Sequence, residues 1–212
     1  MTRMSSEFRE KLEAIAEFSK QYLKKTGRAP ILVGGQALEV YTLGERATQD
    51  IDMLARTDLA AGILKEMGFT QVDRNFVRRT ESSGIYFELL GAQEVNDDSE
   101  ATERILEIDI DGTGEKIFRI IAPEDLVLDR LSACKHRKSF DDGLWAEVLL
   151  RNGLSGRYGN FDIEYIRKKA SDPRYDVLEI FEEIVARIGD TIEPDIPDNA
   201  SGDASGNRGE ST

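Results

Sequence analysis

The sequence predicts an α/β fold, in which a small, mixed, twisted sheet precedes a helical C-terminal part and a disordered tail. A short, wholly apolar run over residues 30–33 ends at two glycines, as a buried strand does when it enters a tight turn. Residues 48–55 alternate between polar and apolar side chains, which is the period of a strand. After Pro123, apolar residues recur at spacings of three and four, which is the period of a helix.

Length and composition restrict the class of protein. The chain has 212 residues, enough for one large domain with its own core. A content of 40% hydrophobic and 33% charged residues is typical of a soluble globular protein and excludes collagen-like, fibrous and wholly disordered chains. No apolar stretch approaches the roughly 20 residues that cross a bilayer. The first residues lack the apolar core of a secretory signal, so we expect a cytoplasmic protein without membrane contact.

The charge balance and the scarcity of cysteine and histidine limit the partners. Lys and Arg number 28 and Asp and Glu 41, for a net charge of −13, so any nucleic-acid contact needs a local basic patch. Residues 135–138 form the clearest one. A single Cys134 and a single His136 exclude an internal disulfide and the usual zinc frameworks. Any metal must therefore be held by carboxylates, which suits Mg²⁺ or Mn²⁺.

Pattern and capping residues predict the elements in order. Helices are expected over residues 5–25, 36–43, 57–67, 123–134, 141–151, 161–170 and 174–188, and strands over 30–33 and 48–55. Two hairpins complete the sheet, 70–80 with 85–90 and 105–110 with 116–121, and a polar loop separates them. We expect an N-terminal helix (1–28), a core (29–122), a helical subdomain (123–189) and a disordered acidic tail (190–212).

The chemistry is concentrated in two adjacent motifs. Gly34 and Gly35, at the start of a helix, expose backbone N–H groups that can hold phosphate oxygens. Asp50 and Asp52, two residues apart on the next strand, point the same way and can share divalent cations. Either motif alone is weak evidence for a functional site, because an isolated Asp-x-Asp more often belongs to a solvated strand. Residues 107–111 show the same spacing without a glycine turn.

Together the motifs resemble a known family. The run GGQALEVYTLGERATQDID, residues 34–52, resembles the core of the nucleotidyltransferase superfamily, which has the DNA polymerase beta-like fold. Residues 46–52 and 122–131 are most similar to the small prokaryotic branch that includes AbiEii-like toxin nucleotidyltransferases. The resemblance extends over residues 29–150. It implies transfer of a nucleoside monophosphate from an NTP to a hydroxyl acceptor, with Mg²⁺ or Mn²⁺ as cofactor.

The resemblance also implies roles for individual residues. Asp50 and Asp52 would bind the metals, together with a third carboxylate from a later strand. Glu88, alone among apolar residues, is the first choice for it, although many family members have Asp here, and Asp109 is the reserve. The groups expected to hold the triphosphate are Gly34, Gly35, the amide of Gln36, Arg46 and Lys135. Lys135 can equally be a solvated residue at a helix end.

The acceptor and the partners remain open. The resemblance favours RNA, such as a tRNA end, or a protein side chain, and leaves a small molecule as a further option. It also suggests a cognate partner in a toxin–antitoxin pair. The alternative is a protein of this fold without turnover, which binds a nucleotide or a partner; Glu88 in place of Asp and the lack of a strongly basic groove favour it.

Overall fold

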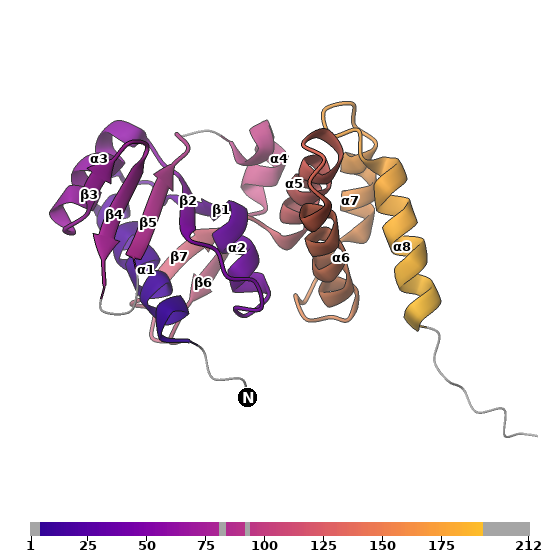
Figure 1. Cartoon of the computed structure of the whole chain (residues 1–212), viewed down its shortest axis with the longest axis horizontal. Coiled ribbons are helices and arrows are strands. Elements are labelled where there is room, and N and C mark those ends of the chain that lie inside the picture. The colour runs from indigo at the N-terminus through magenta and orange to yellow at the C-terminus, as the bar shows by residue number, and fades with distance from the viewer. Residues whose placement is uncertain (1–4, 81–83, 92–93, 193–212) are drawn as a thin grey trace, which may run out of the picture.

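The structure, a computed structural model, describes residues 5–80, 84–91 and 94–192. Figure 1 shows the strands and α1 and α3 in one half of the molecule and α5–α8 in the other, with α2 and α4 between them. Among the described residues, no helix combines the length and the apolar character that a membrane crossing requires.

A seven-stranded mixed sheet forms the first half. Its order is β3-β4-β5-β2-β1-β7-β6. β2 pairs in parallel with β5, and β1 with β7, and the other neighbours are antiparallel. The strands are β1 (Ile31–Val33), β2 (Asp50–Leu54), β3 (Thr70–Val72), β4 (Asn75–Arg79), β5 (Gly84–Leu89), β6 (Leu106–Asp109) and β7 (Ile117–Ile120). The predicted fold class, a mixed α/β sheet with a helical C-terminal part, is confirmed.

Capping residues mark the two ends of α1 and the start of α5. The Ser5 side chain accepts the Phe8 N–H at the start of α1, and Gly27, with φ +71°, ends it. Pro123 is the first residue of α5. The helical elements are α1 (Ser6–Thr26), α2 (Gly34–Tyr41), α3 (Thr57–Glu66), the 3-10 turn η1 (Val95–Asp97), α4 (Ser99–Glu103), α5 (Pro123–His136), α6 (Phe140–Leu154), α7 (Ile163–Ala170) and α8 (Leu178–Ile192).

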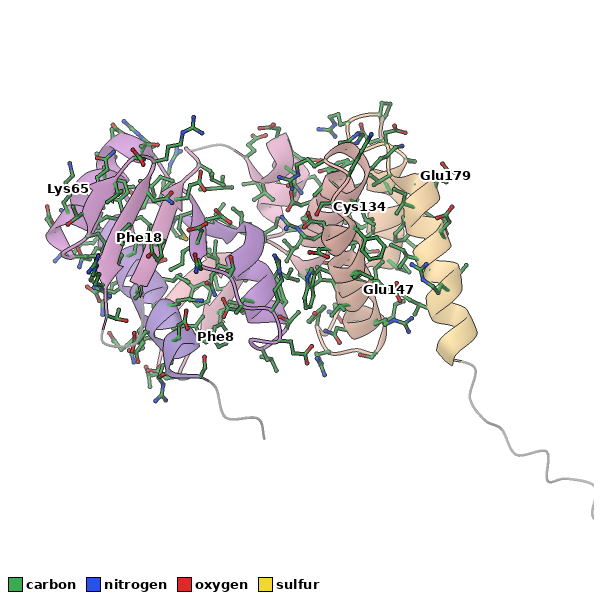
Figure 2. All side chains as sticks on the ribbon, viewed as in Figure 1. Phe8, Phe18, Lys65, Cys134, Glu147 and Glu179 are labelled. Atoms are coloured by element: carbon green, nitrogen blue, oxygen red, sulfur yellow. The ribbon has the colours of Figure 1, made fainter. Side chains whose placement is uncertain are left out.

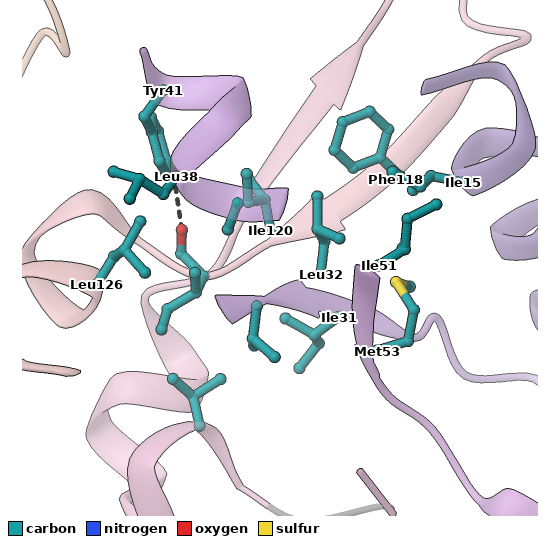
Figure 3. Packing of buried hydrophobic residues seen from close by; sticks show 14 of the residues in the cluster. Ile15, Ile31, Leu32, Leu38, Tyr41, Ile51, Met53, Phe118, Ile120 and Leu126 are labelled. Carbon is teal, nitrogen blue, oxygen red and sulfur yellow. Dashed lines mark hydrogen bonds between the residues drawn. The ribbon is translucent and has the colours of Figure 1, made fainter. Parts of the chain in front are cut away.

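The two faces of the central strands differ in burial and polarity. On β2, Ile51 and Met53 are fully buried, while Asp50, Asp52 and Leu54 on the other face are partly exposed. Figure 3 shows Ile51 and Met53 packed with residues of β1, β7 and α1. At the edge of this core the Tyr41 hydroxyl donates to the carbonyl of Ile121 at 2.7 Å, which ties α2 to the chain entering α5 (Figure 3). On the other face, β2 and β5 carry Asp50, Asp52 and Glu88, while Ile31 and Val33 of β1 are buried.

Three sequence expectations need correction. The stretch predicted as a polar loop between the hairpins contains η1 and α4, since Asp98 caps α4 by accepting the Glu100 N–H. Residues 70–80 form two strands, because Asp73, with φ +54°, turns the chain between them. The last helix begins at Leu178, after a turn over residues 172–175. The predicted disordered tail lies outside the described residues, except that its first residues continue α8 to Ile192.

The second half is a helical group joined by ion pairs. Glu147 of α6 pairs with Arg187 of α8 at 2.9 Å, and Figure 2 shows Glu147 on the side of α6 that faces α8. Arg130 of α5 pairs with Asp142 of α6 at 2.7 Å. α5 packs against α6 and α7 on one side and against α2 and η1 on the other.

Candidate functional site

Strand pairing brings Asp52 and Glu88 side by side. Asp52 of β2 lies opposite Glu88 of the parallel strand β5, and opposite Val33 of β1. Paired residues project to the same face of a sheet, so the two carboxylates share the face opposite the core. Asp50 projects to this face two residues earlier on β2. The structure thus places the three predicted carboxylates on one face, with Asp52 between the other two.

The Gly34–Gly35 turn is fitted against Asp52. Gly34 has φ +63°, and a Cβ built on it would lie 2.1 Å from Oδ2 of Asp52, so only glycine fits here. The Gly35 N–H donates to the same Oδ2 at 3.2 Å. The Gly35 amide at the start of α2 therefore holds the Asp52 carboxylate. The phosphate-binding role expected for Gly34 and Gly35 stays a prediction.

The acid–base properties of Asp52 follow from this environment. Burial raises the pKa of Asp52 to about 6, and the negative charges of Glu88 and Asp50 add to the increase. The Gly35 N–H and the Arg130 guanidinium act in the opposite direction. A partly buried carboxylate beside two others is disfavoured in its charged form, and a cation placed among the three would relieve that cost.

Asp52 and Glu88 open into a pocket of about 500 Å³, here called the carboxylate pocket, whereas Asp50 is not among the described residues that line it. Its floor is the face of β1, β2 and β5 that carries Asp52 and Glu88, and its walls come from η1 and α5. The polar and charged residues lining it are Asp52, Glu88, Glu94, Asn96, Asp97, Asp129, Arg130 and Arg137. A mixed lining of acids and arginines suits a ligand that carries both metal cations and phosphates.

Arg130 is the functional candidate that sequence reasoning missed. Its guanidinium is hydrogen-bonded to Asp129 and lies 2.7 Å from Asp142 of α6, and its side chain is 11% exposed. Two carboxylates thus fix the direction of the guanidinium at the pocket wall. Arg130 is the last residue of the motif Pro123–Arg130, which the sequence analysis singled out. The sequence alone does not tell which face of α5 borders the pocket.

The other predicted phosphate-binding residues lie elsewhere. Lys135 does not line the carboxylate pocket; its ammonium group pairs with the Asp176 carboxylate at 2.8 Å. The Arg46 guanidinium carbon lies 5.7 Å from the centre of the Trp145 ring, and one guanidinium nitrogen is buried with no hydrogen-bond partner in the described part of the chain. The Gln36 side chain is fully buried, and neither of its polar atoms has a hydrogen-bond partner among the described residues. The role expected for the Gln36 backbone amide stays a prediction.

Asp109, the reserve carboxylate, is separated from β2 by β1 and β7. It is exposed at the edge strand β6, where it accepts the Gly114 N–H at 2.7 Å. Between Glu88 and Asp109, the geometry therefore brings only Glu88 to Asp52. The second Asp-x-Asp pattern, over residues 107–111, therefore stabilises a turn.

A buried ionic network supports the η1 wall of the pocket. Asn96 and Asp97 both have positive φ, +53° and +52°, which is costly for residues other than glycine. The Asn96 side chain donates to the Asp125 carbonyl at 3.1 Å. Asp98 is held by the buried Lys169 of α7 at 2.6 Å, and although burial alone would raise the pKa of Asp98, this pairing keeps it below its usual value. The segment is thus anchored from both sides.

A second buried network positions the loop that precedes β2. The Lys11 side chain of α1 is 1% exposed, and its ammonium group contacts Glu39 of α2 at 3.2 Å and the Thr48 carbonyl at 2.5 Å. The Thr48 hydroxyl lies 3.0 Å from where a Cβ of Gly35 would be. Lys11 therefore fixes the loop that packs on the glycine turn and leads into Asp50.

The donor set fits a hard divalent cation by its chemistry. Asp50, Asp52 and Glu88 offer only carboxylate oxygens, which Mg²⁺ and Mn²⁺ prefer, and two of the three are in register on neighbouring strands. The carboxylates are not drawn together into a closed cage: within residues 5–80, 84–91 and 94–192, no three His, Cys, Asp or Glu side chains are grouped closely enough to hold a metal ion.

Comparison with solved structures identifies the fold. The chain is similar to an antigenic nucleotidyltransferase-like protein from Paracoccidioides brasiliensis, with a TM-score of 0.52, 15% identity, and coverage of 89% of this chain and 90% of that one. This similarity shows that the chain has a nucleotidyltransferase-like fold.

Weaker similarities were found to the antibiotic-resistance factor ANT(2'')-Ia. Its solution structure matches with a TM-score of 0.45, 15% identity, and coverage of 80% of this chain and 96% of that one. Its crystal structure with adenylyl-2"-tobramycin matches at 0.43, 12% identity, and coverage of 84% and 98%. No protein-family model matches the sequence, and no curated protein does.

Proposed function

We propose that this protein transfers a nucleoside monophosphate from an NTP to a hydroxyl acceptor. The observation that carries the proposal is the side-by-side placement of Asp52 and Glu88 beneath the Gly34–Gly35 turn. The nucleotidyltransferase-like fold and the resemblance of residues 34–52 to that superfamily support the same reaction.

The proposed reaction forms one bond and breaks one. The acceptor hydroxyl oxygen bonds to the α-phosphorus of the NTP, and the bond from that phosphorus to its bridging oxygen breaks, so that pyrophosphate leaves with the electron pair. Glu88 accepts the hydroxyl proton, since its carboxylate borders the pocket. Arg130, held by Asp129 and Asp142, stabilises the negative charge that develops on the pyrophosphate.

We expect Mg²⁺ or Mn²⁺ to be required, held by Asp50, Asp52 and Glu88. When bound, the cation would neutralise phosphate charge and lower the pKa of the attacking hydroxyl. Asp52 must be ionised to act as a ligand, and the Gly35 N–H, which donates to it, favours that form. The same hydrogen bond holds the carboxylate toward the glycine turn.

We also propose that the chain belongs to the AbiEii-like branch and acts in the cytoplasm with a cognate toxin or antitoxin partner. The motif Pro123–Arg130 supports this assignment, and two of its acids have structural tasks. Glu124 accepts the Asp162 N–H at 2.9 Å and pairs with Arg104 at 3.0 Å. Asp125 accepts the Tyr165 hydroxyl at 2.7 Å. The motif thus joins α5 to α4 and α7 and presents Arg130 to the pocket.

A label-transfer assay tests the function. Each α-³²P NTP is incubated with Mg²⁺ or Mn²⁺, total RNA or total protein, and either the wild type or Asp52→Asn. We expect label in one acceptor pool, lost in the variant. A folded wild type that binds NTP and labels nothing would instead favour the alternative, a nucleotide-binding or partner-binding protein without turnover.

A further inference from the structure

A second pocket, of about 850 Å³, lies at the start of β1 and the end of β2. It is lined by four basic side chains, Lys25, Arg28, Arg56 and Arg119, and is here called the basic pocket. They come from the end of α1, the loop before β1, the residue before α3, and β7. Such a group could not be read from the sequence, because its members are far apart along the chain.

The basic pocket opens on the same face of the sheet as the carboxylates. Ile31 of β1 lies opposite both Leu54 of β2 and Arg119 of β7. This cross-strand row is two residues along the strands from the row that holds Asp52 and Glu88, so it projects to the same face, roughly 7 Å away. Leu54 lines both pockets. The two pockets are therefore neighbours along one face.

The lining of the basic pocket contrasts with the composition of the chain. Acids outnumber bases by 41 to 28 in the sequence, yet none of the described residues that line this pocket is acidic. Within the part of the chain that the structure describes, Arg28 has no ion-pair partner. The other three pair with acids outside the lining: Lys25 with Glu66 at 2.5 Å, Arg56 with Asp58 at 2.8 Å, and Arg119 with Glu107 at 3.0 Å.

Those three pairs do not block the pocket. In each pair, both side chains are at least 42% exposed, and exposed ion pairs contribute little because water and salt screen them. A phosphate group offers an arginine two acceptor oxygens and a stronger, charge-assisted contact. The bases can therefore exchange these acids for a bound phosphate at little cost.

The remaining lining suits a nucleoside. Leu23 and Leu59 are 49% and 39% exposed, and Tyr22 and Ile105 lie beside them. Cations next to exposed apolar side chains match a ligand in which phosphates alternate with flat, apolar rings. A free inorganic anion would use the cations but not the apolar side chains.

We propose that the basic pocket binds the phosphate groups of the acceptor, and that the acceptor is a polynucleotide strand whose end reaches the carboxylate pocket across Leu54. The inference rests on the proposed function for the identity of the acceptor, but binding of the strand does not require turnover. It uses a different basic group from residues 135–138, where Lys135 pairs with Asp176.

The test measures strand binding without NTP or metal. A 5′-fluorescein hexaribonucleotide is titrated with the full chain by fluorescence anisotropy, for wild type, the double variant Arg28→Gln/Arg119→Gln, and Arg74→Gln. Arg74 is an exposed arginine between β3 and β4 that lines neither pocket, so it is the matched control. We expect the double variant to bind at least about tenfold more weakly, with its salt slope reduced by about 1.4, since each single-strand phosphate contact contributes about 0.7.

Competition with AMP distinguishes the source of the phosphate. Displacement only by longer strands supports a polynucleotide acceptor, whereas displacement by AMP at equal affinity per molecule assigns the pocket to a small phosphorylated acceptor. Equal hexanucleotide binding in all three proteins, or none in the wild type, overturns the inference. The two proposals fail separately: loss of metal-dependent NTP binding in Asp52→Asn tests the proposed function, whereas the hexanucleotide titration, which contains neither NTP nor metal, tests the basic pocket.

Discussion

Gly34 and Asp52 are in such close contact that a single added carbon on Gly34 would lie 2.1 Å from a carboxylate oxygen of Asp52. This contact joins the two motifs that the sequence singles out. The glycine turn does not merely precede the aspartate strand, because it sets where the Asp52 carboxylate can lie.

Gly34→Ala should therefore disturb the site more than the fold. We expect metal-dependent NTP binding to weaken at least about tenfold, because the new Cβ displaces Asp52. Gly27→Ala is the control: Gly27 has a similar φ, +71°, with nothing within 4 Å of an added Cβ. It should cost only about 1 kcal/mol of unfolding free energy, from the left-handed backbone, and leave NTP binding unchanged. Equal NTP affinity in both variants would contradict this view of the contact.

Arg130, and not Lys135, should be the cation that contacts the triphosphate. Arg130→Met is expected to raise the Kd for Mg²⁺–NTP at least about tenfold, because a guanidinium directed by two carboxylates is lost from the pocket wall. Lys135→Met should change the Kd by less than about twofold, since Lys135 pairs with Asp176. Isothermal titration of folded variants decides between them, and the reverse order of effects would restore the assignment made from the sequence.

Lys11 should support the site through the fold. In Lys11→Met, Glu39, whose side chain is 4% exposed, loses its buried cation, which is expected to cost about 3–5 kcal/mol of unfolding free energy. Lys20→Met, which breaks an exposed pair with Glu115, should cost less than about 1 kcal/mol. Urea denaturation measures both. Adding Glu39→Gln to Lys11→Met should recover part of the loss, and no recovery would argue against an uncompensated charge as its cause.

Asp125 should make stability depend on pH. Burial raises the pKa of Asp125 to about 6, although the Tyr165 hydrogen bond opposes the increase. Because the folded pKa lies above the unfolded one, the contribution of Asp125 is fully present below about pH 4 and is lost as the pH rises through 6. The unfolding free energy of the wild type minus that of Asp125→Asn should fall by on the order of 2–3 kcal/mol between pH 4 and pH 7. If this difference in unfolding free energy did not change with pH, the folded protein would not shift the pKa of Asp125.

The sequence was sufficient to predict the two central strands, β1 and β2, and the placement of Glu88 beside Asp52. The apolar run 31–33 and the alternation over 50–54 each have one physical interpretation, and both strands formed as predicted. Glu88 could be chosen because a lone acid on an apolar strand needs a partner, and strand register places it opposite Asp52.

The rest depended on packing that local patterns do not encode. Arg130 and Lys135 are five residues apart on α5, so they face different sides of the helix, and only the packed structure shows which side meets the sheet. Asp109 has the same local pattern as Asp52, but strand order places it at the far edge of the sheet. η1 and α4 were missed because their apolar residues are few, and their stability comes from the pairing of Asp98 with Lys169.

The most direct test of the central claim is a crystal structure of the full chain with a non-hydrolysable NTP analogue and Mn²⁺, in which anomalous scattering locates the metal. The account predicts a Mn²⁺ peak between Asp52 and Glu88, with the triphosphate directed toward Arg130. A triphosphate bound elsewhere, or a metal held without either carboxylate, would contradict it.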